Sequence, residues 1–192
     1  MIDAVTFLCY NGYKQNGGMN VQLFVISDTH GRYDILRRIL AEHLNADLIV
    51  HCGDGQYETD RLLSEHPELE QKLIRVRGNC DHDRAIPLAR VIPLPYGHKA
   101  VVVHGHTMMY GDFQQNLVDI AQQEHADIVL FGHLHVRIDR NVSGIRLFNP
   151  GSAAQPRDQF PPGFGLVDIM ESGILTSHGN ISRSSTDYMP EW

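Results

Sequence analysis

Apolar runs of strand length alternate with glycine-containing turns over the first two thirds of the chain. These runs cover residues 21–26, 46–52, 72–76, 100–103 and 127–131. After three of them, apolar side chains recur at the spacing of an amphipathic helix. The expected helices lie at about 35–40, 58–64 and 113–124. The alternation predicts an α/β domain whose helices pack outside the strands.

The last third of the chain reads as β structure alone. Two glycine-containing turns, at 142–144 and 171–173, each join a pair of short apolar runs. The paired runs are 136–140 with 145–148, and 164–169 with 174–177. Both pairs predict antiparallel hairpins. The fold class is therefore α/β, with one mixed sheet or two stacked mixed β-sheets flanked by helices.

Each of the five apolar runs ends in Asp, Asn or His with glycine beside it. In order, these residues are Asp28 and His30, Asp54, Asn79 and Asp81, His104 and His106, and His133 and His135. In open α/β sheets, ligands bind beyond the carboxyl ends of the strands, and glycine lets the backbone approach a ligand closely. One such end could be an ordinary turn, but five in order predict a single site.

The donor types in this set favour divalent metal ions. Residues i and i+2 of an extended backbone point the same way, so Asp28 and His30 are expected to bind one ion. On a strand, the Cα atoms of His133 and His135 would lie roughly 6.5–7 Å apart, which suits two ions about 3.5–4 Å apart. Asp54 has two oxygens and suits a bridging position. Nitrogen and oxygen donors without an obligatory thiolate suit Mn²⁺, Fe, Zn²⁺ or Ni²⁺.

The ordered set Asp28-x-His30, Gly53-Asp54, Gly78-Asn79-x-Asp81, His104 and Gly132-His133-x-His135 resembles the calcineurin-like metallophosphoesterase family. The small single-domain prokaryotic phosphodiesterases are the most similar members. The resemblance implies two packed mixed β-sheets flanked by helices. It also implies a phosphodiesterase that uses a bridging metal-bound hydroxide at a dinuclear centre, often with Mn²⁺, on a small phosphodiester substrate.

The resemblance also assigns roles to individual residues. Asp28, His30 and His135 would bind the first metal, and Asn79, His104 and His133 the second, with Asp54 bridging. Asp54 and Asn79 are thus expected in catalysis, and Asn79 also in substrate binding.

One position departs from the pattern of many relatives. Cys80 stands where they carry a histidine that contacts the scissile phosphate and can protonate the leaving group, although the small diesterases share the cysteine. His106 and His82 are the nearby candidates for a substitute acid, and His106 could equally form hydrogen bonds within its turn.

Weaker signals lie outside the ordered set. Arg157, in a proline-rich loop, is a candidate for contacting the substrate phosphate, with a solvated surface arginine as the alternative. Residues 149–152 resemble a segment near the site in the small relatives, or form a simple turn.

Composition bears on the binding partners and the cellular compartment of the protein. A formal net charge of -7 disfavours a stable complex with nucleic acid. No apolar stretch is long enough to span a membrane. An odd number of cysteines, 3, without a secretory signal favours the reducing cytoplasm. Residues 1–18 are interpreted as an extension before the domain at 19–192, serving as an edge strand or a contact in a homo-oligomer.

Two other functions remain open at this point. A phosphomonoesterase, for example a phosphoprotein phosphatase, could use the same metal centre. A non-catalytic scaffold is the other alternative, because a retromer subunit has a similar fold with a degraded metal set. All seven ligand positions carry competent side chains here, which favours an enzyme.

Overall fold

The computed structural model describes residues 20–182. The strands are β1 (Val21–Ile26), β2 (Leu48–His51), β3 (Leu73–Arg75), β4 (Ala89–Pro93), β5 (Lys99–Val103), β6 (Ile128–Phe131), β7 (Arg137–Val142), β8 (Ile145–Pro150), β9 (Gly163–Met170) and β10 (Gly173–Asn180). The α-helices are α1 (Tyr33–Glu42), α2 (Gln56–Glu65) and α3 (Phe113–Glu124). Three short 3₁₀ helices are η1 (Pro67–Gln71), η2 (Pro95–Gly97) and η3 (His106–Met108).

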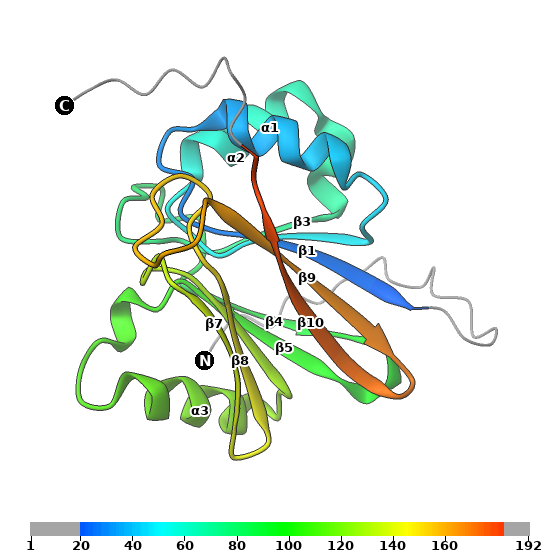
Figure 1. The fold of residues 1–192 in the computed structure, drawn as a ribbon, viewed down its shortest axis with the longest axis vertical. Coiled ribbons are helices and arrows are strands. Elements are labelled where there is room, and N and C mark those ends of the chain that lie inside the picture. The colour runs from blue at the N-terminus through cyan, green and yellow to red at the C-terminus, as the bar shows by residue number, and fades with distance from the viewer. Residues whose placement is uncertain (1–19, 183–192) are drawn as a thin grey trace.

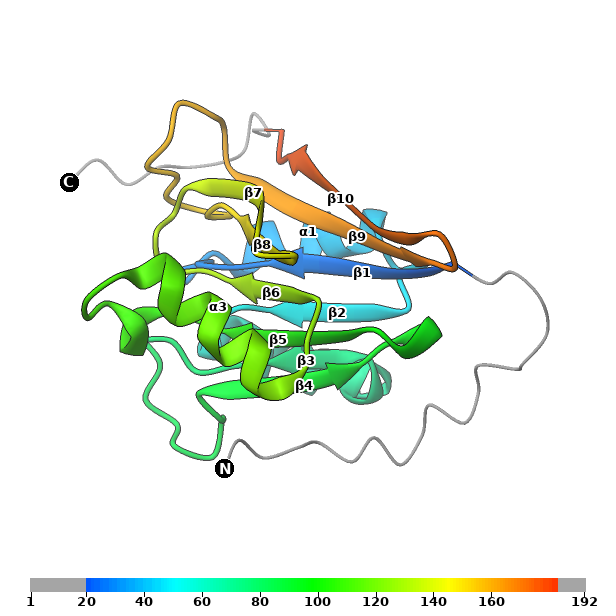
Figure 2. The same ribbon diagram turned by 90° about the horizontal axis from the view of Figure 1, so that it is seen from below.

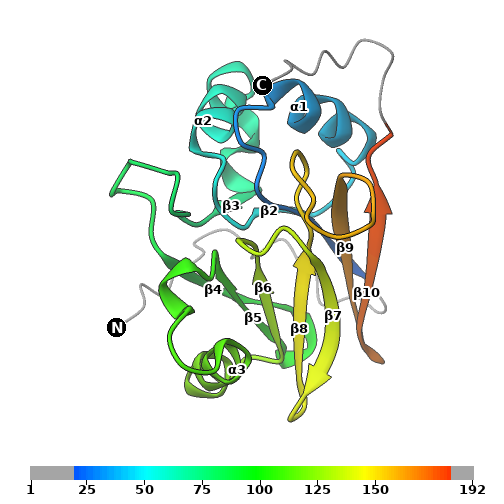
Figure 3. The same ribbon diagram turned by 60° about the vertical axis from the view of Figure 1, so that its left-hand side comes forward.

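The strands form two mixed sheets of five strands each. The first sheet has the order β10-β9-β1-β2-β3 and the second the order β4-β5-β6-β8-β7. The two sheets are stacked, with α1 and α2 on the outer face of the first and α3 on the outer face of the second (Figures 1 and 3). This arrangement confirms the predicted fold class of two stacked mixed β-sheets flanked by helices.

Alternating side chains in each strand serve two different cores. In β1, Leu23 and Val25 point into the core between the sheets, whereas Phe24 and Ile26 pack against α1 and α2. The second sheet follows the same rule against α3, and Val101 in β5 belongs to that outer core. Both faces of the central strands are buried, which is why they read as continuous apolar runs.

The parallel strands bring their carboxyl ends to one edge of each sheet. β1 is parallel to β2, and β2 to β3. β5 is parallel to β6 in the second sheet. Figure 2, seen from below, looks through the two layers, with α3 and the second sheet in front of the first sheet. The loops that follow β1, β2, β3, β5 and β6 therefore meet, as the sequence predicts.

One strand was not predicted from the sequence pattern. β4 (Ala89–Pro93) pairs antiparallel with β5 at the edge of the second sheet. Ile92 is its one fully buried residue, and Ala89 and Val91 pack against the outer core while remaining partly exposed. An edge strand with one fully buried residue gives a weak apolar signal, which explains the omission. Residues 1–18, predicted to be an extension, lie outside the described residues.

No helix in residues 20–182 is long and apolar enough to cross a membrane.

Candidate metal centre

The proposed ligands sit on an unusual backbone. Asp28, His30, Asp54, His133 and His135 all have left-handed φ values, between 43° and 67°. The prediction that an extended backbone aligns each i, i+2 pair is therefore wrong, because these residues lie in tight loops after the strands have ended. Asp and His tolerate this region better than most residues. The loops nevertheless bring the same side chains together.

Three donors form a first group at the end of β1. The ring nitrogens His30 Nε2 and His135 Nε2 lie 3.0 Å apart. Asp28 Oδ1 lies 3.1 Å from His135 Nε2 and 3.8 Å from His30 Nε2. These residues are those predicted for the first metal.

A second group lies beside the first and shares an aspartate with it. Asp28, Asp54 and His104 present donor atoms within 4.8 Å of one another. His104 Nε2 lies 3.4 Å from Asp54 Oδ2 and 3.1 Å from Asn79 Oδ1. The His133 ring lies 5.1 Å from the His104 ring, centre to centre. The four residues predicted for the bridge and the second metal are therefore also brought together.

The two carboxylate oxygens of Asp54 have different neighbours. Oδ1 accepts the backbone N–H of Cys80 at 2.8 Å. Oδ2 lies between the two groups, 3.4 Å from His104 Nε2 and 3.9 Å from His30 Nε2. This oxygen is therefore the part of Asp54 that both groups share.

Several side-chain atoms at the centre are hydrogen-bond acceptors for which the described residues supply no donor. His104 Nδ1 lies 2.8 Å from the Cys52 carbonyl, and His135 Nδ1 lies 2.7 Å from the Gln155 carbonyl. Each Nδ1 must therefore carry the proton, which leaves the Nε2 lone pair of the neutral ring pointing into the centre. Asp28 Oδ1 is buried and has no hydrogen-bond partner among the described residues. Such a set fits cations, because metal-binding histidines commonly donate their other N–H to a carbonyl.

Histidine neighbours also shift the charge on the aspartates. Burial by itself would lower the pKa of His104, but its hydrogen bond to Asp54 and the carboxylate charges raise it, so the ring can also take a second proton at Nε2. Burial by itself would raise the pKa of Asp54, but the hydrogen bond and charge of protonated His104 outweigh it and hold that pKa well below its usual range. Burial is likewise outweighed at Asp28, where His135 and His104 lower the pKa. Both carboxylates are thus ionised near neutral pH and add two negative charges to the centre.

His106 lies at the border of the centre. Its ring lies 5.4 Å from that of His104 and 6.2 Å from that of His133. Its Nδ1 is buried and has no hydrogen-bond partner within residues 20–182. Burial and the nearby His104 charge lower the pKa of His106. The structure thus places this residue within reach of the centre without assigning it a bond.

Cys80 contributes a thiol to the same neighbourhood. Its sulfur lies within 4.8 Å of a donor atom of His30 and of Asp54. Partial burial and the Asp54 carboxylate raise the pKa of this thiol to about 11. A neutral thiol at that position is a weak proton donor.

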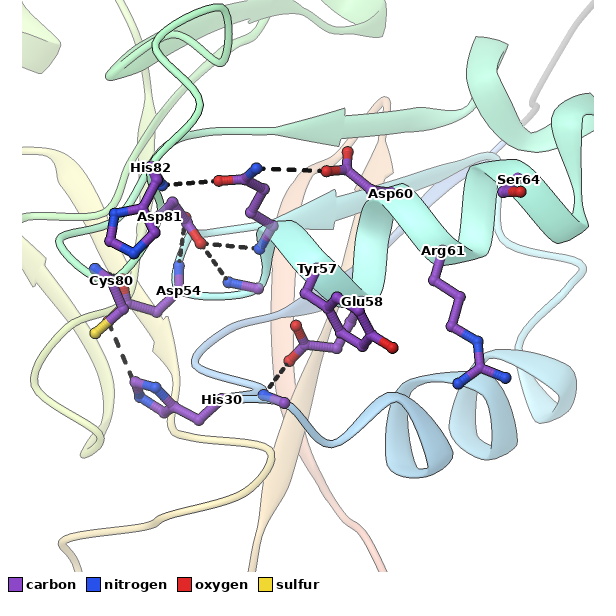
Figure 4. Close-up of a pocket in the computed structure, with 13 residues that line it drawn as sticks. His30, Asp54, Tyr57, Glu58, Asp60, Arg61, Ser64, Cys80, Asp81 and His82 are labelled. Carbon is purple, nitrogen blue, oxygen red and sulfur yellow. Dashed lines mark hydrogen bonds and ion pairs between the residues drawn. The ribbon is translucent and has the colours of Figure 1, made fainter.

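Asp81 has a role that the sequence analysis missed. Its Oδ2 accepts the backbone N–H groups of Asp54 at 2.9 Å and of Gly78 at 2.7 Å. Its Oδ1 accepts those of Gly55 at 3.0 Å and of Gln56 at 2.8 Å. One carboxylate therefore joins the loop after β3 to the loop after β2 and caps α2 (Figure 4).

A second missed contribution lies beneath the first group. Ser27 Oγ donates to Asp28 Oδ2 at 2.6 Å, and the His133 backbone N–H donates to the same oxygen at 3.1 Å. These bonds orient Asp28 so that Oδ1 faces the centre. Close packing makes the neighbouring glycines necessary, since a Cβ on Gly132 would collide with Ser27 Oγ, and one on Gly78 with Asp54 Oδ1.

The weaker candidates have mixed outcomes. Residues 149–152 support the site from behind, because Asn149 Nδ2 donates to the Gly132 carbonyl at 2.8 Å and Ser152 Oγ to the Asp28 carbonyl at 2.8 Å. The Arg157 backbone N–H donates to the His135 carbonyl at 2.8 Å, but its side chain is exposed. Its contact with substrate remains a prediction.

Comparison with known proteins agrees with this geometry. The calcineurin-like phosphoesterase superfamily domain matches residues 21–172. The probable metallophosphoesterase YsnB of Bacillus subtilis is 37% identical over 156 residues, which cover 79% of this chain and 85% of that protein. Phosphodiesterase YfcE of Escherichia coli is 27% identical over 168 residues, covering 77% of this chain and 88% of YfcE.

A solved structure supports the same relationship. A predicted phosphoesterase from Streptococcus pneumoniae superimposes with a TM-score of 0.67 at 26% identity. The match covers 84% of this chain and 99% of that one.

Proposed function

The chain belongs to the calcineurin-like phosphoesterase superfamily, and from this premise we propose that it hydrolyses phosphodiesters at a centre of two divalent metal ions. Nitrogen and oxygen donors suit Mn²⁺, Fe, Zn²⁺ or Ni²⁺, and we propose Mn²⁺ among them because the family resemblance implies it. The observation that carries the proposal is the convergence of acceptors without donors, above all the buried Asp28 Oδ1 beside two histidine lone pairs.

The two groups of side chains define the proposed ligands. Asp28, His30 and His135 bind one ion. Asn79, His104 and His133 bind the other. Asp54 Oδ2 is shared, because it lies between His30 and His104 and its partner oxygen is already bonded to the backbone of Cys80.

When bound, the two ions would supply a water of lowered pKa and neutralise the phosphoryl oxygens. The protein's own groups complete the reaction. Asn79, exposed beside His104, is proposed to contact a phosphoryl oxygen of the substrate. His106, whose buried Nδ1 is unbonded in the described chain, is proposed to give a proton to the leaving oxygen. Arg157 is proposed to meet the substrate at the rim.

Two observations bear on the alternatives. Phosphodiesterase YfcE, which this chain resembles over most of its length, supports diester rather than monoester hydrolysis. A scaffold does not need buried carboxylates that are ionised and face histidine lone pairs, because such a cluster destabilises the fold when no cation is bound.

The test is metal removal followed by a substrate panel. Protein treated with a chelator should lose hydrolysis of bis(4-nitrophenyl) phosphate and recover it with Mn²⁺. Elemental analysis at saturation should give two ions per chain, and kcat/KM should be higher for diesters than for 4-nitrophenyl phosphate. Full activity after complete metal removal would refute the mechanism, and a preference for the monoester would favour the phosphatase alternative.

A further inference from the structure

A cleft of about 700 Å³ opens beside the metal centre and runs along α2 (Figure 4). We propose that this cleft binds one alcohol portion of the phosphodiester and selects an uncharged alcohol that carries an aromatic ring. The inference rests on the proposed function, because it assumes that the phosphoryl group lies at the metal centre.

The cleft is continuous with the centre. His30, Asp54 and Cys80 line it, and the same three residues present donor atoms within 4.8 Å of one another. A phosphoryl group held at the centre would therefore have one ester oxygen directed toward the mouth of the cleft. The cleft volume lies within the range of about 300–1,000 Å³ typical of pockets for small molecules.

One face of α2 forms the long wall of the cleft. Apart from Glu58, the lining residues of this helix follow the i, i+4, i+8 spacing of a single face, at Gln56, Tyr57, Asp60, Arg61 and Ser64. Eight residues of helix span about 12 Å. An alcohol group attached to the phosphorus can therefore lie along α2 over the length of a ring of nucleoside size.

The charged groups of the wall already have partners. Arg61 Nε donates to Glu65 at 2.8 Å, and its guanidinium lies over the Tyr33 ring at 4.2 Å. Arg75 forms an ion pair with Asp60.

The carboxylates nearer the centre are engaged as well. Glu58 accepts the Gly31 N–H at 2.6 Å, and Asp81 accepts four backbone N–H groups. Arg61 is the one arginine or lysine among the described residues that line the cleft. A second phosphate or a carboxylate on the occupant would therefore meet several acidic groups and no arginine or lysine free of an acidic partner, whereas a neutral occupant would meet no such penalty.

Tyr57 supplies the surface for a ring. It is 63% exposed, a high value for a large aromatic side chain, and it is the second residue of α2, at the end of the wall nearest the centre (Figure 4). An exposed aromatic face next to a reaction centre can stack on a planar ring of the substrate. Such stacking tolerates different rings, so the cleft would select a class of alcohol rather than one compound.

The experiment measures binding rather than turnover. Calorimetry on the Mn²⁺-loaded protein gives Kd for methylphosphonate, phenylphosphonate and 4-carboxyphenylphosphonate, none of which is hydrolysed. Phenylphosphonate should bind about tenfold more tightly than methylphosphonate, the size of a good aromatic contact. The 4-carboxyl group should remove most of this advantage. Tyr57→Ala should abolish the advantage without changing methylphosphonate binding, and Tyr57→Phe should retain it.

Tyr96→Ala is the matched control. Tyr96 is 44% exposed and precedes β5, at the end of that strand opposite to His104. This variant should leave all three Kd values unchanged. Equal binding of phenyl and methyl ligands, a phenyl advantage that survives Tyr57→Ala, or no phosphonate binding at all would overturn the inference. A phenyl advantage in a protein that hydrolyses no diester would refute the proposed function alone, and diester hydrolysis without the advantage would refute the cleft alone.

Discussion

Replacing Asp81 by Asn keeps the size of the side chain but converts one of its two acceptor oxygens into a donor. In the native protein each oxygen accepts two backbone N–H groups. Whichever way the introduced amide turns, its nitrogen faces two N–H groups that it cannot bond. The two pairs belong to Asp54 with Gly78, and to Gly55 with Gln56.

The structure gives the size of the effect. A hydrogen bond to a charged group contributes about 1.5–3 kcal/mol, and Asp81 is partly exposed, so the loss of two should cost about 2–4 kcal/mol. For a chain of this size, each kcal/mol corresponds to roughly 2–4 °C in Tm. The metal-free variant should therefore melt about 5–15 °C below the native protein. Because Asp54 sits on the disrupted loop, Mn²⁺ affinity should fall by about 10–100-fold.

Differential scanning calorimetry and Mn²⁺ titration measure the two effects. Asp83→Asn is the matched control, since Asp83 lies in the same loop, is exposed, and accepts the backbone N–H of Ala85. That variant should stay within about 2 °C of the native Tm. If Asp81→Asn also stays within this margin and binds Mn²⁺ normally, the hydrogen bonds of Asp81 to the loops after β2 and β3 do not position Asp54.

Four further outcomes follow from the same site. Asp54→Asn should lower kcat more than His30→Ala, because it removes a charge that faces both groups, whereas water can replace one neutral ligand; near-normal turnover in Asp54→Asn would contradict the shared-ligand assignment. Cys80→His should make kcat depend less steeply on leaving-group pKa across a series of aryl and alkyl diesters, since imidazole is a better proton donor than a neutral thiol. His106→Ala should lose activity on alkyl diesters by about 10²-fold or more and keep it on aryl diesters; equal losses on both would remove the acid role. Burial lowers the pKa of His51 below its usual 6.5. The stability contributed by its neutral form is therefore present above about pH 6.5 and lost as pH falls through the lowered pKa. Urea unfolding of the metal-free protein should show a free energy of unfolding that falls as the pH is lowered below 6.5, and a rising free energy would contradict the lowered pKa.

Local signals in the sequence predicted the regular elements well. α3 begins and ends at the predicted residues, because Asp112 precedes the apolar periodicity and accepts the Gln115 N–H as an N-cap. β4 has no such signal, since it is an edge strand with Ile92 as its one fully buried residue. Its existence depends on pairing with β5, which is a tertiary contact that a local pattern does not encode.

The sequence predicted which side chains come together but not the geometry in which they do so. Each strand end marks its own donor, so the set could be read from the order of residues along the chain. The left-handed backbone at Asp28 and His135 could not, because it arises from how the loops close after the strands end. The role of Asp81 could not either, since it depends on the separation between the loops after β2 and β3.

The left-handed backbone of five proposed ligands also bears on how such a chain changes over evolutionary time. A non-glycine residue in this conformation costs on the order of 1 kcal/mol, and glycine would adopt it without that cost. Asp28, Asp54 and His135 also make hydrogen bonds that hold neighbouring loops, so glycine at these positions would leave buried groups unpaired. Within residues 20–182, no such backbone-supporting bond is made by the side chain of His133, so a duplicated copy released from selection for hydrolysis would lose little folding stability by exchanging it for glycine. Persistence of His133 in a lineage would therefore be a record of continued selection for what it binds.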